Sequence, residues 1–104
     1  MDIMLRALAD GTRRQILGMV WRTERTAGEI AAEFAMTRPA ISQHLATLRE
    51  SDLVTVRQDG TRRLYRANLR TVARLRRELG QFWDKHLGQL KDAAEASERK
   101  ARRS

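Results

Sequence analysis

The chain has no cysteine, a single proline and only two histidines among its 104 residues. Without cysteine it can form neither disulfides nor thiolate metal sites, and nothing points to secretion. Its apolar runs are far shorter than the roughly 20 residues of a membrane-spanning helix, and the N-terminus lacks the apolar segment of a signal peptide. We therefore expect a cytoplasmic protein, and no residue pattern requires a cofactor.

Enzymatic motifs are missing as well. The sequence has no glycine-rich phosphate loop. Ser42 and His44 are two residues apart, so on a helix their side chains diverge, and His86 is the only other histidine that could act as a base. We expect no catalytic activity.

The length suffices for one hydrophobic core and not for two. We expect one domain over residues 1–96, followed by a charged tail over residues 97–104 that frays. The core of such a domain is modest, and a partner chain could add to it.

Basic residues outnumber acidic residues by 21 to 13, which gives a formal net charge of +8. The excess is concentrated between Arg57 and Arg77, where eight arginines accompany one acid, Asp59. A solvated face would explain such an excess, but the stretch contains no lysine, and planar guanidinium groups suit paired contacts with phosphate. We interpret it as a surface for a polyanion such as nucleic acid.

The segment 37–50 has the pattern of a helix that packs on one side and reads DNA on the other. Thr37 is a suitable N-cap, and Pro39 falls in the first turn, where no intrahelical hydrogen bond is lost. Small and polar side chains on the outer face would let the helix approach base edges, and Gln43 could pair with adenine in the major groove. The opposite, apolar stripe comprises Ile41, Leu45 and Leu48.

A second short helix is predicted just upstream. Thr26 and Glu29 form the capping-box pattern T-x-x-E, so this helix begins at Thr26 and buries Ile30 and Phe34. Only Ala35–Met36 then precedes the cap of the next helix. An ordinary amphipathic surface helix would explain segment 37–50 alone, but two short helices joined by so tight a turn match the helix-turn-helix arrangement.

The N-terminal part predicts two further helices, one over residues 2–9 and one that Asp10 caps and that runs to about Trp21. Arg13 and Arg14 lie in the first turn of the second helix, where basic groups oppose the helix dipole. Either an acidic group lies near them or both are solvated, and we favour solvation for Arg14. The predicted apolar stripes are Ile3, Met4 and Leu8, and then Ile16, Leu17 and Val20.

A β-hairpin follows the helix-turn-helix. The segment 53–58 is rich in β-branched residues, Asp59–Gly60 is a strong turn signal, and the segment 61–66 predicts a returning strand. Such a hairpin is only marginally stable alone, so residues such as Leu53 and Tyr65 must pack against the helices. The expected fold is mainly α-helical with a small β-hairpin.

Three stretches share the motifs of one known family, namely Ala7–Leu17 (ALADGTRRQIL), Ser42–Leu45 (SQHL) with Leu48, and Leu53–Val54 with Arg57, Gly60 and Tyr65. In this order they resemble the ArsR family of bacterial winged-helix repressors. The resemblance implies a winged helix-turn-helix fold that is dimeric through its terminal helices. The family usually has a glycine just before its Leu-Val pair, where a left-handed backbone is favoured, and here the residue is Asp52.

The last part of the chain predicts a long amphipathic helix from Leu69, with Asn68 as N-cap, to about Ala96. One small domain offers little for its apolar stripe to pack against, and the resemblance also implies a homodimer. We expect a second copy of the chain to cover the stripe. The residues expected at this interface are Leu79, Phe82, Trp83, His86 and Leu90.

The resemblance and the charge pattern together predict a repressor that binds double-stranded DNA. Two recognition helices related by a twofold axis predict an imperfect palindrome with half-sites about 34 Å apart, and the resemblance favours autoregulation. His44 could read a base, contact a phosphate or be a half-buried helix residue. The predicted DNA-binding residues are Thr37, Arg38, Ser42, Gln43, His44, Arg57, Arg62 and Arg63.

The resemblance raises two alternatives. Many ArsR-like proteins bind metal through cysteines, which are absent here, or through Asp, His and Glu of the terminal helix, of which Asp84 and His86 remain. Glu95 or Glu98 could complete a site across a dimer, but His86 lies on the apolar stripe, so we expect no metal site. A protein-interaction module is the other alternative, and it would show an apolar outer face on segment 37–50.

Overall fold

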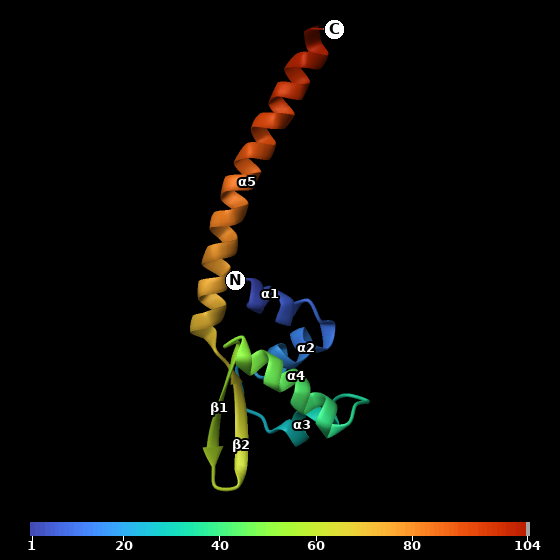
Figure 1. Ribbon diagram of the computed structural model, residues 1–104, viewed down its shortest axis with the longest axis vertical. Coiled ribbons are helices and arrows are strands. Elements are labelled where there is room, and N and C mark those ends of the chain that lie inside the picture. Colours follow the sequence, from blue (N-terminus) through green and yellow to red (C-terminus); the bar gives the residue numbers. More distant parts are fainter. Residues whose placement is uncertain (104) are drawn as a thin grey trace. The chain divides into compact units, whose positions relative to one another are not determined.

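The computed structural model describes residues 1–103, and the chain divides into two compact units, Met1–Ala73 and the segment from Arg74 onward. The described part is mainly helical with one two-stranded antiparallel sheet, as predicted. The single domain predicted over residues 1–96 stays a prediction. In chain order the elements are α1 (Asp2–Leu8), α2 (Gly11–Met19), α3 (Ala27–Ala32), α4 (Arg38–Glu50), β1 (Val54–Asp59), β2 (Arg62–Ala67) and α5 (Leu69–Arg103) (Figure 1).

The predicted N-caps are confirmed. Asp10 accepts a hydrogen bond from the Arg13 backbone N–H (3.1 Å), and Thr37 accepts one from the Ala40 N–H (3.3 Å). Thr26 and Glu29 form the full capping box, with reciprocal hydrogen bonds of 3.1 and 3.2 Å. Such a cap typically stabilises a helix by about 1 kcal/mol, so these side chains define where α2, α3 and α4 begin.

The core of the first unit lies where α4 contacts α1, α2, α3 and β1. The apolar stripes of α2 and α4 are buried as predicted, but in α1 Met4 and Ala7 are buried and Ile3 is 66% exposed. The prediction that Ile3 packs is wrong, because α1 buries only the side on which positions 4 and 7 lie. The fully buried large side chains are Ile16, Val20, Ile30, Ile41, Leu45, Leu48, Leu53 and Val54.

The turn of the helix-turn-helix is longer than predicted. Helix α3 ends at Ala32, and the Glu33 and Phe34 amides donate to the carbonyls of Ile30 and Ala31 (both 3.1 Å). These bonds span three residues and tighten the end of the helix. Phe34 therefore lies in the turn and is half-buried, not a core residue of the helix.

Helix α4 ends in a left-handed residue, as expected at the position of Asp52. Asp52 has φ 63°, its N–H donates to Arg49 O (3.0 Å), and the Leu53 N–H donates to Leu48 O (2.9 Å). This pattern is a Schellman motif, in which the carbonyls of the last helical turn are satisfied. Leu53 therefore belongs to the helix end, and β1 begins at Val54, one residue later than predicted.

The hairpin formed by β1 and β2, here called the wing, has a two-residue loop in which Gly60 adopts φ 63°. Asp59 pairs with Arg62 across the loop, so β2 also begins one residue later than predicted. At its other end the wing is attached by backbone hydrogen bonds. Tyr65 exchanges two with Arg25 (3.0 and 2.8 Å).

Helix α5 continues through Arg103, so the predicted helix end near Ala96 is wrong. Residues 97–103 are helical, and Glu98 accepts from Arg102 one turn later (3.2 Å), a pair that supports exposed helices. The predicted cap of α5 is confirmed, since Asn68 Oδ1 accepts from the Thr71 N–H (3.5 Å). Among residues 1–103, no helix combines the length and the apolarity needed to cross a membrane.

Candidate nucleic-acid interface

The outer face of α4 is polar and exposed. Burial of Ile41, Leu45 and Leu48 fixes the inner face, and this leaves Arg38, Ser42 and Gln43 exposed on the outside. The Thr37 side chain, also exposed, serves as the N-cap. The helix therefore presents short polar side chains and one arginine over its first two turns.

A groove of about 570 Å³ lies between α3, the first turns of α4 and the wing. It brings together Arg38 and Ser42 from α4 with Arg62 and Arg63 from the wing. Three of the four arginines predicted to contact phosphate thus line one concave surface, which we call the arginine groove. Its remaining lining residues are Thr26, Ala27, Gly28, Glu29, Thr61 and Tyr65.

A second hollow of about 510 Å³ shares Ser42, Arg63 and Tyr65 with the arginine groove and extends along α4 to Arg49 and Glu50. Sequence reasoning missed Arg49. Two helical turns separate it from Ser42, so helical periodicity alone could have placed both on one face.

Two wing arginines have acidic partners that the sequence did not indicate. Arg62 Nη2 lies 3.1 Å from Glu29 Oε1, and Arg57 Nε lies 2.7 Å from Glu24 Oε2. Arg57 lines neither hollow, so the structure does not bring it together with the other predicted residues. Both pairs are exposed, and such pairs contribute about 0–1 kcal/mol to stability.

Glu29 also belongs to the capping box. Hydrogen bonds from the Thr26 backbone N–H and hydroxyl, together with the nearby Arg62, hold the pKa of the Glu29 carboxyl below its ordinary value. The carboxylate is therefore ionised at neutral pH, both as the helix cap and as the partner of Arg62.

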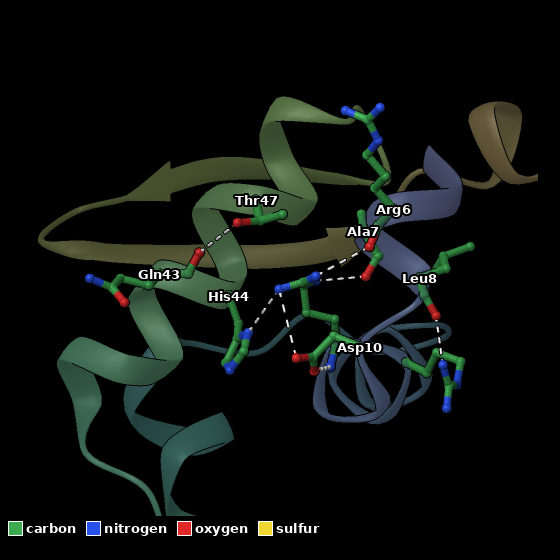
Figure 2. Close-up of polar contacts among 9 residues, drawn as sticks. Arg6, Ala7, Leu8, Asp10, Gln43, His44 and Thr47 are labelled. Carbon is green, nitrogen blue, oxygen red and sulfur yellow. Dashed lines mark hydrogen bonds and ion pairs between the residues drawn. The ribbon is translucent and has the colours of Figure 1, made fainter. Parts of the chain in front are cut away.

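His44 is half-buried and faces α2, not the outer side of α4. Its Nδ1 lies 3.4 Å from Arg13 Nη1. Figure 2 shows the Gln43 side chain pointing away from His44. Of the two adjacent candidates for base contacts, Gln43 is thus the exposed one.

The first turn of α2 is attached to the end of α1 through two arginines. Arg13 donates to the Ala7 carbonyl (2.6 Å) and lies 3.9 Å from the Asp10 carboxylate, so an acidic group does accompany it. The Arg13 N–H and the Arg13 guanidinium hold the pKa of the Asp10 carboxyl below its ordinary value. Arg14 is exposed, as predicted, and its guanidinium also donates to the Leu8 carbonyl (2.7 Å).

Comparison with known proteins identifies the family. Residues 10–56 match the family model described as bacterial regulatory protein, arsR family. The chain is 43% identical over 86 residues to the HTH-type transcriptional regulator Rv2034 of Mycobacterium tuberculosis, an alignment covering 83% of this chain and 80% of Rv2034. The chain belongs to the ArsR family of transcriptional regulators. The predicted resemblance is confirmed.

Two further relatives bear on the function of this ArsR-family chain. The transcriptional repressor SdpR of Bacillus subtilis is 35% identical over 60 residues, which cover 58% of this chain and 67% of SdpR. The homodimeric winged helix-turn-helix DNA-binding domain of Mb0332 from Mycobacterium bovis, a possible ArsR-family regulator, is 36% identical with a TM-score of 0.66. That match covers 83% of this chain and 80% of the domain. The winged helix-turn-helix fold is thereby confirmed.

The residues predicted at the dimer interface of this ArsR-family chain lie along one side of α5. Leu79 is half-buried, whereas Phe82, Trp83, His86 and Leu90 are exposed. The Phe82 ring stacks on His86 (centroids 4.1 Å apart) and meets Trp83 edge-on (5.5 Å). The single chain therefore presents a continuous aromatic and apolar surface that a soluble monomer rarely exposes.

The alternative metal site on α5 lacks support from the geometry. Asp84 and His86 are two residues apart on α5, and no third ligand accompanies them among residues 1–103. His86 Nδ1 donates to the Phe82 carbonyl (2.8 Å), which leaves only its other nitrogen free. Within residues 1–103, no group of three or more His, Asp or Glu side chains is arranged to hold a metal ion.

Proposed function

We propose that this ArsR-family chain is a homodimeric repressor that binds a palindromic operator through α4 and the wing. The arginine groove carries the proposal. Its three arginines lie beside the exposed polar face of α4, which places positive charge next to the residues suited to reading bases. Phosphate contacts set the register of a protein on DNA, and base contacts then give specificity.

The proposed roles follow from position and chemistry. Arg38, Arg62 and Arg63 contact phosphates that flank the major groove, and Thr37 faces the backbone from the start of α4. Ser42 and Gln43 read base edges from its exposed face. Arg57, outside both hollows, contacts DNA only if the wing lies along the minor groove.

We propose that two chains associate through the exposed side of α5. The aromatic surface around Phe82 supports this, and the M. bovis Mb0332 domain is a homodimer. A twofold axis then relates two copies of α4, and the half-sites of the operator lie about one helical turn, ~34 Å, apart.

We propose that the bound dimer blocks transcription by occupying promoter DNA, including the promoter of its own gene. SdpR, a relative named a transcriptional repressor, supports repression. The absence of cysteine, and of a group of three or more metal-binding side chains among residues 1–103, favours metal-independent binding, with release by another signal or by falling protein concentration.

The test starts by recovering bound duplexes from a random-sequence pool with the purified full chain. We expect an imperfect palindrome, which should also be protected by the protein upstream of its own gene. Transcription from that promoter in vitro should fall as protein is added. Recovery of unselected sequences at moderate salt would favour a protein-interaction module, and increased transcription would contradict repression.

The metal alternative has its own test. The complex with the recovered duplex is titrated with zinc, nickel, cobalt and cadmium, and no release is expected at one equivalent. Release by one equivalent, abolished by His86→Ala, would show a metal sensor that uses residues from both chains.

A further inference from the structure

We propose that Arg13 is a positioning residue for DNA recognition, which acts through His44 to set the rotation of α4 about its own axis. The inference rests on the proposed function, because its readout is the sequence preference of α4. It assigns His44 to support of the recognition helix and not to contact with DNA.

The Arg13 guanidinium is held from several sides. Its side chain is only 19% exposed. Nε donates to Ala7 O (2.6 Å) and Nη2 to Arg6 O (3.2 Å), so two carbonyls at the end of α1 fix the plane of the group. The dashed lines in Figure 2 show these bonds to Arg6 and Ala7 and the contact with His44. A guanidinium held in this way offers Nη1 in one fixed direction.

The fixed Nη1 faces the recognition helix. It lies 3.4 Å from His44 Nδ1, on the inner side of α4. A guanidinium can only donate, so His44 Nδ1 is the acceptor in this contact. This polar contact joins the first turn of α2, which holds the end of α1, to the middle of α4.

The contact matters because it is polar, whereas the α4 side chains that are buried in the core are apolar. Ile41, Leu45 and Leu48 set which side of α4 faces the core, and the Arg13 contact adds a directional restraint that apolar burial does not provide. A hydrogen bond depends on angle. Gln43 and His44 are adjacent, so a rotation that breaks the Arg13 contact also turns the Gln43 side chain away from its base edge.

The chain provides a matched control in Arg14. It is the next residue and also donates to the end of α1, at Leu8 O (2.7 Å). Within residues 1–103 its hydrogen bond goes to α1 and none goes to α4. Both Arg13→Met and Arg14→Met remove one positive charge and bonding to α1, two bonds for Arg13 and one for Arg14. Arg13→Met also removes the 3.9 Å ion pair with Asp10 and, unlike Arg14→Met, the contact with α4.

The experiment measures dissociation constants for the duplex recovered by the wild-type protein and for a random duplex, at a temperature where all variants are folded. We expect Arg13→Met to weaken binding to the recovered duplex about tenfold, as loss of a charge-assisted hydrogen bond does. Binding to the random duplex should change less than about twofold. The specificity ratio is the dissociation constant for the random duplex divided by that for the recovered duplex. Arg14→Met should leave this ratio unchanged. Equal ratios for the two variants would overturn the inference.

Variants of His44 keep the inference testable if Arg13→Met does not fold. His44→Asn places an acceptor near the position of Nδ1 and should retain the wild-type ratio, whereas His44→Leu should lower it as Arg13→Met does. Adding Arg13→Met to His44→Leu should lower the ratio no further. If Asn and Leu lower the ratio equally, His44 contacts DNA directly and the inference is wrong. A wild-type protein without any sequence preference would instead overturn the proposed function itself, and the inference with it.

Discussion

The hydroxyl of Thr71, buried in the first turn of α5, donates a 3.1 Å hydrogen bond to the carboxylate of Asp52 at the end of α4. Asp52 is the non-glycine residue with positive φ in the part of the chain that the structure describes. An aspartate tolerates this conformation less well than glycine, and the bond from Thr71 offsets part of that cost. The pair joins the end of the recognition helix to the start of the terminal helix.

Thr71→Val should therefore reduce the free energy of unfolding by about 1 kcal/mol, because it removes the donor and keeps the shape of the side chain. Urea denaturation measures this change. Thr55→Val is the control, since its hydroxyl is exposed and 3.5 Å from its acceptor, Arg66 O. Asp52→Asn should be nearly neutral, because asparagine keeps an acceptor and tolerates positive φ. An equal loss for Thr71→Val and Thr55→Val would contradict this role.

Gln43→Ala should cost about 1–3 kcal/mol of binding free energy on the recovered duplex and relax the preference at one position in each half-site. Binding to random DNA should hardly change, because base contacts contribute little there. Fluorescence anisotropy with both duplexes measures the difference. Gln15→Ala, another exposed glutamine but on α2, should leave both affinities unchanged. Equal weakening on the two duplexes would remove Gln43 from the base-reading set.

Arg62→Ala should weaken binding to all sequences alike and lower the slope of log affinity against log salt by about one unit. The reason is that one phosphate contact, and the counterion release that accompanies it, is lost. Affinities over a series of salt concentrations measure the slope. Arg22→Ala removes an exposed arginine outside both hollows and serves as the control. A change of sequence preference without a change of slope would place Arg62 on a base edge.

Phe82→Asp should convert the dimer to monomer, because it places a charge in the centre of the exposed aromatic surface of α5. Sedimentation equilibrium measures the molecular mass, and circular dichroism reports whether the chain is folded. Gln81→Asp adds the same charge on the opposite side of the helix, so this variant should remain dimeric. A stable Phe82→Asp dimer that still binds DNA would place the interface elsewhere.

Low pH should reduce the free energy of unfolding, in part because the Glu29 carboxylate becomes protonated. The pKa of its carboxyl is lowered from 4.5 in the folded chain, mainly by hydrogen bonds from Thr26. A lowered pKa contributes stability that is present above pH 4.5 and is lost as the pH falls through the folded value. Glu29→Gln should flatten the fall in unfolding free energy below pH 4.5, as measured by urea denaturation at each pH. A fall as steep as that of the wild type would exclude this contribution.

Local signals explain why much of the fold was predictable. The caps at Asp10, Thr26 and Thr37 involve residues within three positions of each other, so spacing alone identifies them. The apolar stripe of α4 likewise follows from one helical period. The left-handed backbone at Asp52 was expected only through the family resemblance.

Contacts between distant segments were not predictable. Glu24 and Arg57 are 33 residues apart, as are Glu29 and Arg62, and Arg13 and His44 are 31 apart. No local pattern pairs such side chains, so the sequence assigned the wing arginines to DNA without finding their acidic partners. The exposure of Ile3 was missed for a related reason, since an isolated stripe does not say which of its residues the neighbouring helices cover.

The two ends of the wing are held to the helices by contacts of different strength. Moving its base would break the backbone bonds between Tyr65 and Arg25 and that from Ala67 N–H to Val20 O (2.9 Å), and would expose the buried Leu64. Moving its tip would break only the exposed pair of Arg62 with Glu29, a contact of about 0–1 kcal/mol. The wing is therefore firmly attached at its base and weakly held at its loop, so the arginines near the loop can change position while the helical core stays in place.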